Sequence, residues 1–333
     1  MNRTLRDPLD ALHGALAADA LAMPVHWYYD RAALRRDYGQ IREYLAPRNP
    51  HPDSILWRSS YTPLNAKGDI LREQARFWGQ RGVHYHQFLA AGENTLNFRL
   101  AVELYRQIVA NNGYDANLWL SHYTAFLLEP GHHRDTYVEE VHRGFFTRHA
   151  QGKKLTDCAV EDIHIGGLAP VPALFAALSE DKHVLDASVG EHISLTHRQK
   201  DVQRASKCLT RILTAILEGS GVRQAIEAEG SDWLSPRTAA AWLREPDLKV
   251  IGSRVSPACY IQDAFPASLY LAWKYHDDFE SGVCANAEVG GDNCHRGAVV
   301  GSILGLANGV PLRWVDGLAE PISAPTSDRQ TRQ

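Results

Sequence analysis

The sequence has few cysteines, few methionines and no long apolar run. Five cysteines and two methionines occur among its 333 residues, and the cysteines are scattered without a C-x-x-C pair. This pattern argues against a disulfide framework and a zinc knuckle, and it predicts reduced thiols in the core. The longest small-apolar stretch, residues 298–307, is about half the roughly 20 residues that a membrane span requires. We therefore do not expect a membrane protein.

The chain also lacks an excess of charge of either sign. It has 35 Lys and Arg against 39 Asp and Glu, which gives a formal net charge of -4 at pH 7. This balance provides no positive field to hold a nucleic acid or an anionic membrane, so the expected partner is a small molecule. Asp7, Pro8 and Asp10 interrupt the apolar stretch that a secretory signal requires, and we expect a cytoplasmic protein.

Regular apolar–polar alternation is missing too, which argues against a sandwich or a doubly wound sheet. Apolar residues instead recur at helical spacing over residues 97–109 and 197–218. Ser235 followed by Pro236 is a further helix start. Residues 46–67 contain four prolines and predict a long ordered loop, a candidate lid. The fold class that these features predict is all-α.

The absence of an internal repeat or a central linker favours one domain. We expect a multi-helix bundle over residues 7–315, which is large but within the range of single domains. The polar, aperiodic segment over residues 316–333 predicts a disordered tail.

A glycine-rich segment near the C-terminus, residues 290–309, contains a candidate functional side chain and glycines that favour close helix packing. Gly290 and Gly291 permit a tight turn, Asp292 stands where a helix begins, and glycines then recur every fourth residue. These glycines leave one face of the helix without side chains, which predicts that a neighbouring helix approaches closely. Taken alone, Asp292 is most simply explained as a helix N-cap.

Two other segments carry oxygen-bearing side chains at or inside predicted helices. Glu93, Asn94 and Thr95 are consecutive at a helix start, where the simplest explanation is again a capped N-terminus. Asp19 lies inside a helix of small residues near the N-terminus. If Asp19 is buried it needs a hydrogen-bonding partner, and if it is exposed it needs none. Both possibilities stay open.

Taken in order, these segments resemble the ADP-ribosylglycohydrolase family over about residues 9–311. The family's Gly-Asp in its first helix is matched by Ala18-Asp19, and its Thr-Asp-Asp-Thr motif by residues 92–95. Its Gly-Gly-Asp-x-Asp-Thr motif is matched by residues 290–295. A glycine-rich ligand loop and a ligand-side histidine of the family are matched by Gly166, Gly167 and His197.

The resemblance implies an orthogonal all-α bundle that hydrolyses a glycosidic bond to ADP-ribose or a related nucleoside derivative, using one or two divalent cations, commonly Mg²⁺. It assigns catalysis to Glu93 and Asp292. It assigns the metal to Glu93, Asn94, Thr95, Asp292, Cys294 and His295. It assigns substrate binding to Asp19, Arg134, Gly166, Gly167, His197, Gly290 and Gly291.

The sequence departs from the family pattern at the metal ligands. Only Glu93 and Asp292 remain where four carboxylates are usual, because Asn94 and Cys294 take the other two positions. The smaller negative charge suits one hard ion or none, whereas Cys294 and His295 suit a softer transition metal. The string GGDNCHRGA is most similar to a divergent branch of the family that contains jellyfish crystallins and a related fish selenoprotein.

Two alternatives to a hydrolase therefore stay open. The chain keeps the fold as a non-catalytic binding or structural protein, or it uses Cys294 as a reactive thiol. The second alternative expects a helix start, His295 and Arg296 to lower the pKa of that thiol. The histidine pair His84 and His86 is left out of the metal set, because paired histidines in loops are most often solvated.

Overall fold

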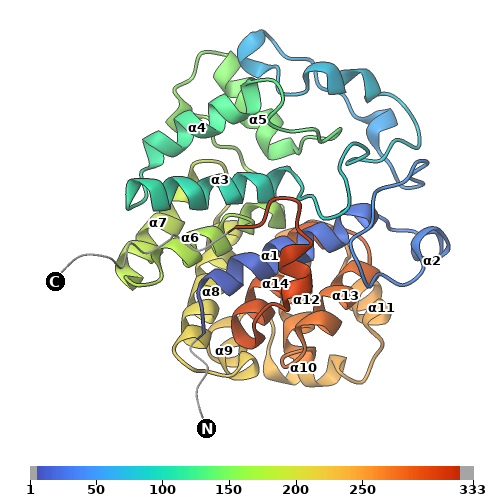
Figure 1. Ribbon diagram of the computed structural model, residues 1–333, viewed down its shortest axis with the longest axis vertical. Helices are drawn as coiled ribbons and strands as arrows, with labels where there is room; N and C mark the ends of the chain where they lie inside the picture. The colour runs from blue at the N-terminus through green and yellow to red at the C-terminus, as the bar shows by residue number, and fades with distance from the viewer. Residues whose placement is uncertain (1–5, 323–333) are drawn as a thin grey trace.

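The structure, a computed structural model, describes residues 6–322 and is built from helices (Figure 1). Within these residues there is no sheet, only isolated bridges between single residues. The all-α prediction is confirmed. The α-helices are α1 (Leu9–Ala22), α2 (Arg31–Tyr38), α3 (Leu96–Asn111), α4 (Ala116–Leu128), α5 (Glu140–Ala150), α6 (Val171–Leu178), α7 (Lys182–Ser194), α8 (Lys200–Leu217), α9 (Val222–Gly230), α10 (Pro236–Trp242), α11 (Asp247–Lys249), α12 (Ile261–Lys274), α13 (Phe279–Glu288), α14 (Asn293–Asn308) and α15 (Leu312–Asp316).

The predicted helices appear with small changes at their ends. The helix predicted over residues 97–109 is α3, and the one predicted over residues 197–218 is α8. Helix α8 begins three residues later than predicted because Thr196 and Arg198 form backbone hydrogen bonds with Val160. The Ser235 hydroxyl caps α10 by accepting a hydrogen bond from the backbone N–H of Thr238 at 3.1 Å.

The proline-rich segment over residues 46–67 is irregular apart from short 3₁₀ turns, as its composition predicts. Other 3₁₀ segments lie outside this stretch, and a π turn, Val250–Arg254, follows α11. The 3₁₀ segments of residues 6–322, including the two in the proline-rich stretch, are Met23–Val25, Leu56–Arg58, Ala66–Gly68, Arg72–Phe77, Leu155–Asp157 and Ile165–Leu168.

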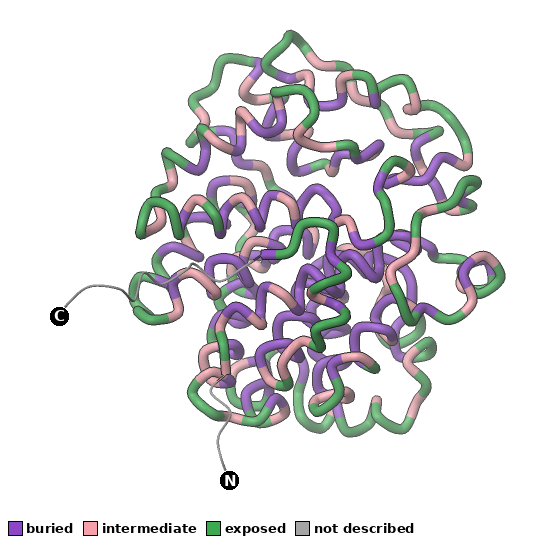
Figure 2. Tube along the Cα trace, viewed as in Figure 1, coloured by how far each residue is buried: buried purple, intermediate pink, exposed green. Residues whose placement is uncertain are grey.

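Helices α1 and α14 lie side by side at the centre of the fold (Figure 1). A Cβ atom added at Gly301 would lie only 2.2 Å from the carbonyl oxygen of Gly14, and one at Gly297 would lie 3.1 Å from the Cβ of Ala18. Only small residues permit this separation, so the close approach that the glycine stripe predicted is confirmed. All residues of α14 from 293 to 306 are buried (Figure 2).

The beginning of the predicted disordered tail is packed against the body instead. Leu318 and Ile322 are buried, and the backbone N–H of Ala319 donates to the carbonyl of Gly92 at 2.9 Å. The prediction of disorder is therefore wrong for residues 316–322, because Asp316 ends α15 and the apolar side chains of Leu318 and Ile322 reach the core. The remaining part, residues 323–333, lies outside the described residues.

None of the helices in residues 6–322 combines the length and the apolar character that crossing a membrane would require.

Candidate functional site

A double-glycine turn places Asp292 at the start of α14. Gly290 and Gly291 have φ angles of 68° and 65°, which favour glycine, and a Cβ at either position would lie within 2.3 Å of a backbone oxygen. The N–H of Gly291 donates to the carbonyl of Tyr28 at 2.7 Å, and the N–H of Trp27 donates to that of Gly291 at 2.9 Å. These two bonds join the segment after α1 to the start of α14.

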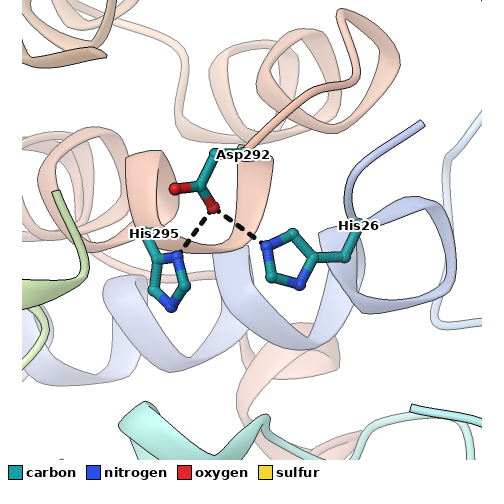
Figure 3. Close-up of side chains that lie close together, drawn as sticks. All are labelled: His26, Asp292 and His295. Atoms are coloured by element: carbon teal, nitrogen blue, oxygen red, sulfur yellow. Dashed lines mark hydrogen bonds and ion pairs between the residues drawn. The ribbon is translucent and has the colours of Figure 1, made fainter. Parts of the chain in front are cut away.

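The carboxylate of Asp292 lies between two histidines (Figure 3). Its Oδ1 atom is 2.9 Å from His26 Nε2 and 2.7 Å from His295 Nδ1. Its Oδ2 atom is buried and has no hydrogen-bond partner among the residues that the structure describes. The side chain of Asp292 makes no cap bond to α14, so the simple N-cap explanation is wrong. These three residues present ligand atoms within 4.8 Å of one another, the spacing of a metal site.

On one side, this histidine–carboxylate centre continues to Glu139, which lies just before α5. Glu139 Oε1 is 2.9 Å from His295 Nε2 and accepts a hydrogen bond of the same length from the amide of Asn97. The Asn97 oxygen is 2.7 Å from His142 Nε2, which fixes the orientation of the amide. The Glu139 side chain is 17% exposed, whereas those of Asp292 and His295 are at most 1% exposed. Glu139 is therefore the solvent-facing carboxylate of the centre.

On the other side, a chain of hydrogen bonds runs from His26 to Asp135. His26 Nδ1 is 2.7 Å from His86 Nε2, and His86 Nδ1 is 2.7 Å from Asp135 Oδ1. Both His84 and His86 are buried. The expectation that this histidine pair is solvated is therefore wrong: the loop that carries the pair is folded into the interior.

Mutual electrostatics sets the charge of the centre. Burial alone would raise the pKa of Asp292, but the nearby His295 and His26 hold it well below its usual range. Burial would lower the pKa of His295, yet Asp292 and Glu139 raise it well above its usual range. The pKa of Glu139 is also lowered, since His295 outweighs the effect of burial. Burial lowers the pKa of His26 to about 3. Because their pKa values are lowered, the carboxylates of Asp292 and Glu139 are both ionised at neutral pH.

The second predicted motif, residues 93–95, lies against Asp19. Asp19 Oδ2 accepts hydrogen bonds from the Asn94 amide at 2.9 Å and the Thr95 N–H at 2.8 Å, and its Oδ1 accepts one from the Thr95 hydroxyl at 2.8 Å. Asp19 is fully buried, so of the two possibilities that the sequence left open, buried or exposed, the structure shows the first. Asn94 and Thr95 thus donate to Asp19. Glu93 points elsewhere, forms an ion pair with Arg134 and is not part of the group around Asp292.

Cys294 does not have the properties of a reactive thiol. Its side chain is fully buried, with Sγ 3.7 Å from the carbonyl oxygen of Asp19. Burial and the nearby Asp19 raise the pKa of this thiol well above its usual range. Arg296 is also buried and donates to the carbonyls of Pro257 and Gly290, so it holds the double-glycine turn. The prediction of a lowered thiol pKa is wrong, because the first turn of α14 is enclosed by protein.

The predicted glycine loop and His197 lie beside the centre. Gly166, Gly167 and His197 line a cavity of about 50 Å³ together with Asn97, which contacts His295. A Cβ at Gly166 would lie 2.9 Å from Glu139 Oε2, so this glycine leaves room for the carboxylate. Ligand pockets usually measure about 300–1,000 Å³, so this cavity admits only part of a nucleotide. A larger cavity of about 530 Å³ is lined by α2 and α13 residues, and none of the predicted site residues lines it.

Four members of the centre, His26, Asn97, Asp135 and Glu139, were not predicted from the sequence, and His86 was left out of the metal set as solvated. The four unpredicted residues form no recognisable sequence motif, because they come from segments far apart in the chain. The one available signal was the placement of His26 shortly after a helix of small residues, next to Trp27.

The fold and the centre define an all-α protein with a buried histidine–carboxylate site. The sequence profile of the ADP-ribosylglycohydrolase family matches residues 3–332, and the chain belongs to this family. A solved structure described as an ADP-ribosylglycohydrolase-related protein complex has the same fold, with a TM-score of 0.60 and 20% identity over 93% of this chain and 91% of that chain. A search of curated proteins finds no match.

Proposed function

We propose that this protein hydrolyses a glycosidic bond to ADP-ribose or a related nucleoside derivative, with Asp292 at the centre of the reaction. One observation carries the proposal: Asp292 is wholly buried between His26 and His295, and its Oδ2 atom has no hydrogen-bond partner within residues 6–322. An unpartnered buried acceptor is costly for folding and is usually retained at a functional site. Family membership supplies the reaction class.

In this proposal Glu139 acts on the solvent side of the centre. Its carboxylate is ionised and partly exposed, and Asn97 and His295 hold it in place. These properties suit a general base that orients a water molecule and removes its proton. Glu139 takes the role that the resemblance gave to Glu93, since Glu93 is paired with Arg134.

A divalent cation belongs to the proposal, but the paired Mg²⁺ set that the family resemblance implies fits these residues poorly. Asn94 and Thr95 donate their hydrogens to Asp19, and Glu93 is paired with Arg134, so this segment does not present the carboxylates that a second hard ion needs. Asp292, His26 and His295 would hold a single cation, which would polarise a water or a ribose hydroxyl.

The residues that the resemblance assigns to substrate binding lie in different parts of the site. Gly166, Gly167 and His197 would contact the part of the ligand that enters the small cavity next to Asn97. Arg134 is half exposed and would reach a pyrophosphate after leaving Glu93. Gly290 and Gly291 position Asp292 through their backbone.

Hydrolysis of ADP-ribosylated arginine and serine tests the proposal directly. Asp292→Asn and Glu139→Gln should lower kcat/KM by about 10²–10⁴, the usual contribution of general acid–base catalysis. Glu103→Gln removes a carboxylate of α3 that pairs with Arg106 at the surface, and this control should keep full activity. Full activity of folded Asp292→Asn protein would refute the assignment.

A non-catalytic binding protein is the second candidate, favoured by the replacement of family carboxylates with Asn94 and Cys294. Thermal unfolding with ADP-ribose, in the presence of a dication or of a chelator, separates the two. A ligand at about 100 times its Kd stabilises the folded state by about 2.7 kcal/mol. A shift of the midpoint without turnover of any ADP-ribosyl substrate selects the binding protein.

A further inference from the structure

We infer that the histidine–carboxylate centre is a site for one transition-metal dication of the zinc type, with an outer shell formed by Glu139 and by the His86–Asp135 pair. His26 Nε2, His295 Nδ1 and a carboxylate oxygen of Asp292 are the ligands. The inference deepens the proposed function, yet it concerns metal binding alone and is tested without a substrate.

The donor set itself selects the class of metal. Two imidazole nitrogens and one carboxylate suit zinc, iron and cobalt, whereas magnesium prefers oxygen ligands in octahedral geometry. His26 comes from the segment after α1, and Asp292 and His295 come from the start of α14. The backbone hydrogen bonds of the double-glycine turn hold these two segments together. Asp292 Oδ2, which is buried and has no hydrogen-bond donor within residues 6–322, is a further acceptor.

Each proposed histidine ligand has an outer partner on its second ring nitrogen. His295 Nε2 lies 2.9 Å from Glu139, and His26 Nδ1 lies 2.7 Å from His86, which in turn lies 2.7 Å from Asp135. Metal-bound histidines almost always donate their free N–H in this way, which fixes the ring and strengthens the ligand. A carboxylate therefore terminates the chain behind each of the two imidazoles.

A count of hydrogens supports a dication at this position. If a metal occupies His26 Nε2 and His295 Nδ1, one N–H on each of His26, His86 and His295 satisfies every outer contact, and all three rings are neutral. Without a metal, the two contacts to Asp292 Oδ1 need two more hydrogens and hence two imidazolium charges in a buried space. One dication supplies the same charge as those two hydrogens.

The neighbouring histidines are not further ligands. His84 Nε2 bonds the carbonyl of Pro24, and its Nδ1 accepts the N–H of His86. His51 is similarly used, because Nε2 bonds the carbonyl of His26 and Nδ1 accepts the N–H of Asp53. Both rings are occupied by backbone and hold the ligand segments in place. Within the described part of the chain the protein thus supplies three ligands, and the remaining positions are left for water or substrate.

Titration of the chelator-stripped, full-length protein with Co²⁺ tests the inference through its visible absorption. We expect one Co²⁺ per chain, displacement by one equivalent of Zn²⁺, and no displacement by a large excess of Mg²⁺. Failure to bind Co²⁺ or Zn²⁺, or equal competition by Mg²⁺, would overturn the metal class.

Two outer-shell variants test the remainder of the inference. His86→Gln and Asp135→Asn should each weaken Zn²⁺ binding about 10–100-fold while the three ligands stay intact. His192→Gln, which changes a buried histidine of α7 that contacts Tyr114, should keep the wild-type affinity. Unfolding of each metal-free variant verifies that it is folded. Wild-type affinity in both outer-shell variants would refute the role of the His86–Asp135 pair.

Discussion

Replacing Gly301 by alanine should destabilise the protein, although alanine is the better helix former. The new Cβ would lie 2.2 Å from the carbonyl oxygen of Gly14, 2.6 Å from its carbonyl carbon and 2.8 Å from the Cβ of Ala18. Two of these three atoms belong to backbone, so relief requires α1 and α14 to move apart. Overpacking of this kind costs about 1–3 kcal/mol, and the backbone contacts put Gly301→Ala at the upper end.

The intrinsic preference of alanine offsets part of that cost. Alanine in a helix interior is more favourable than glycine by about 1 kcal/mol, so the net loss at Gly301 should be about 2 kcal/mol. Gly190 of α7 provides a matched control, because a Cβ there would meet only the end of the Lys207 side chain at 3.6 Å. Gly190→Ala should stabilise the protein by about 0.5–1 kcal/mol.

Urea unfolding followed by circular dichroism measures both changes. The denaturant midpoint should fall for Gly301→Ala and rise for Gly190→Ala, with the slope unchanged in both. A Gly301→Ala protein as stable as the wild type would show that α1 and α14 can separate freely. Close packing would then not limit the size of the residue at position 301.

Three further outcomes follow from local geometry. Ser235→Ala removes the cap of α10 and should cost about 1 kcal/mol, measured by urea unfolding; no loss would show that the capping bond is replaced by water. Cys259, which is partly exposed, should react with a thiol reagent near neutral pH before the buried Cys294, and faster labelling of Cys294 would contradict its raised pKa. Burial lowers the pKa of His142 to about 4 and that of His192 to about 3. The unfolded state binds these protons below about pH 6.5, so the free energy of unfolding should decline as the pH falls from there towards 4. His192→Gln should reduce the slope of the free energy of unfolding against pH by about 1.4 kcal/mol per pH unit. An unchanged slope in that variant would mean that His192 is protonated in the folded protein.

Helix positions were predictable from the sequence because periodicity and caps act over a few residues. The apolar spacing that marks α3 and α8 and the serine before Pro236 each predicted a real helix. Helix α8 starts late because tertiary backbone bonds at Thr196 and Arg198 compete with its first turn. Residues 316–322 were misjudged because two apolar side chains suffice to anchor a short polar segment.

The centre was only partly predictable. Asp292 and His295 follow a glycine motif that is visible in the sequence, and Asp19 needed a partner once it was buried. The choice among possible partners depends on which loops the fold brings together. His26 and Asp292 are 266 positions apart, and nothing in local sequence couples them. Glu139 was missed for the same reason, since a lone glutamate before a helix is common.

The pairing of the first helix with the last long helix has a consequence for biosynthesis. Helix α1 leaves the ribosome about 270 residues before its packing partner α14. At roughly 5–20 residues per second, this delay is about 14–54 s. During that time the face of α1 that packs on α14 lacks its permanent cover, so this face of the nascent chain depends on chaperones or on transient contacts. A ribosome that stalls before Asn293 would release a chain unable to complete either its core or its histidine–carboxylate centre.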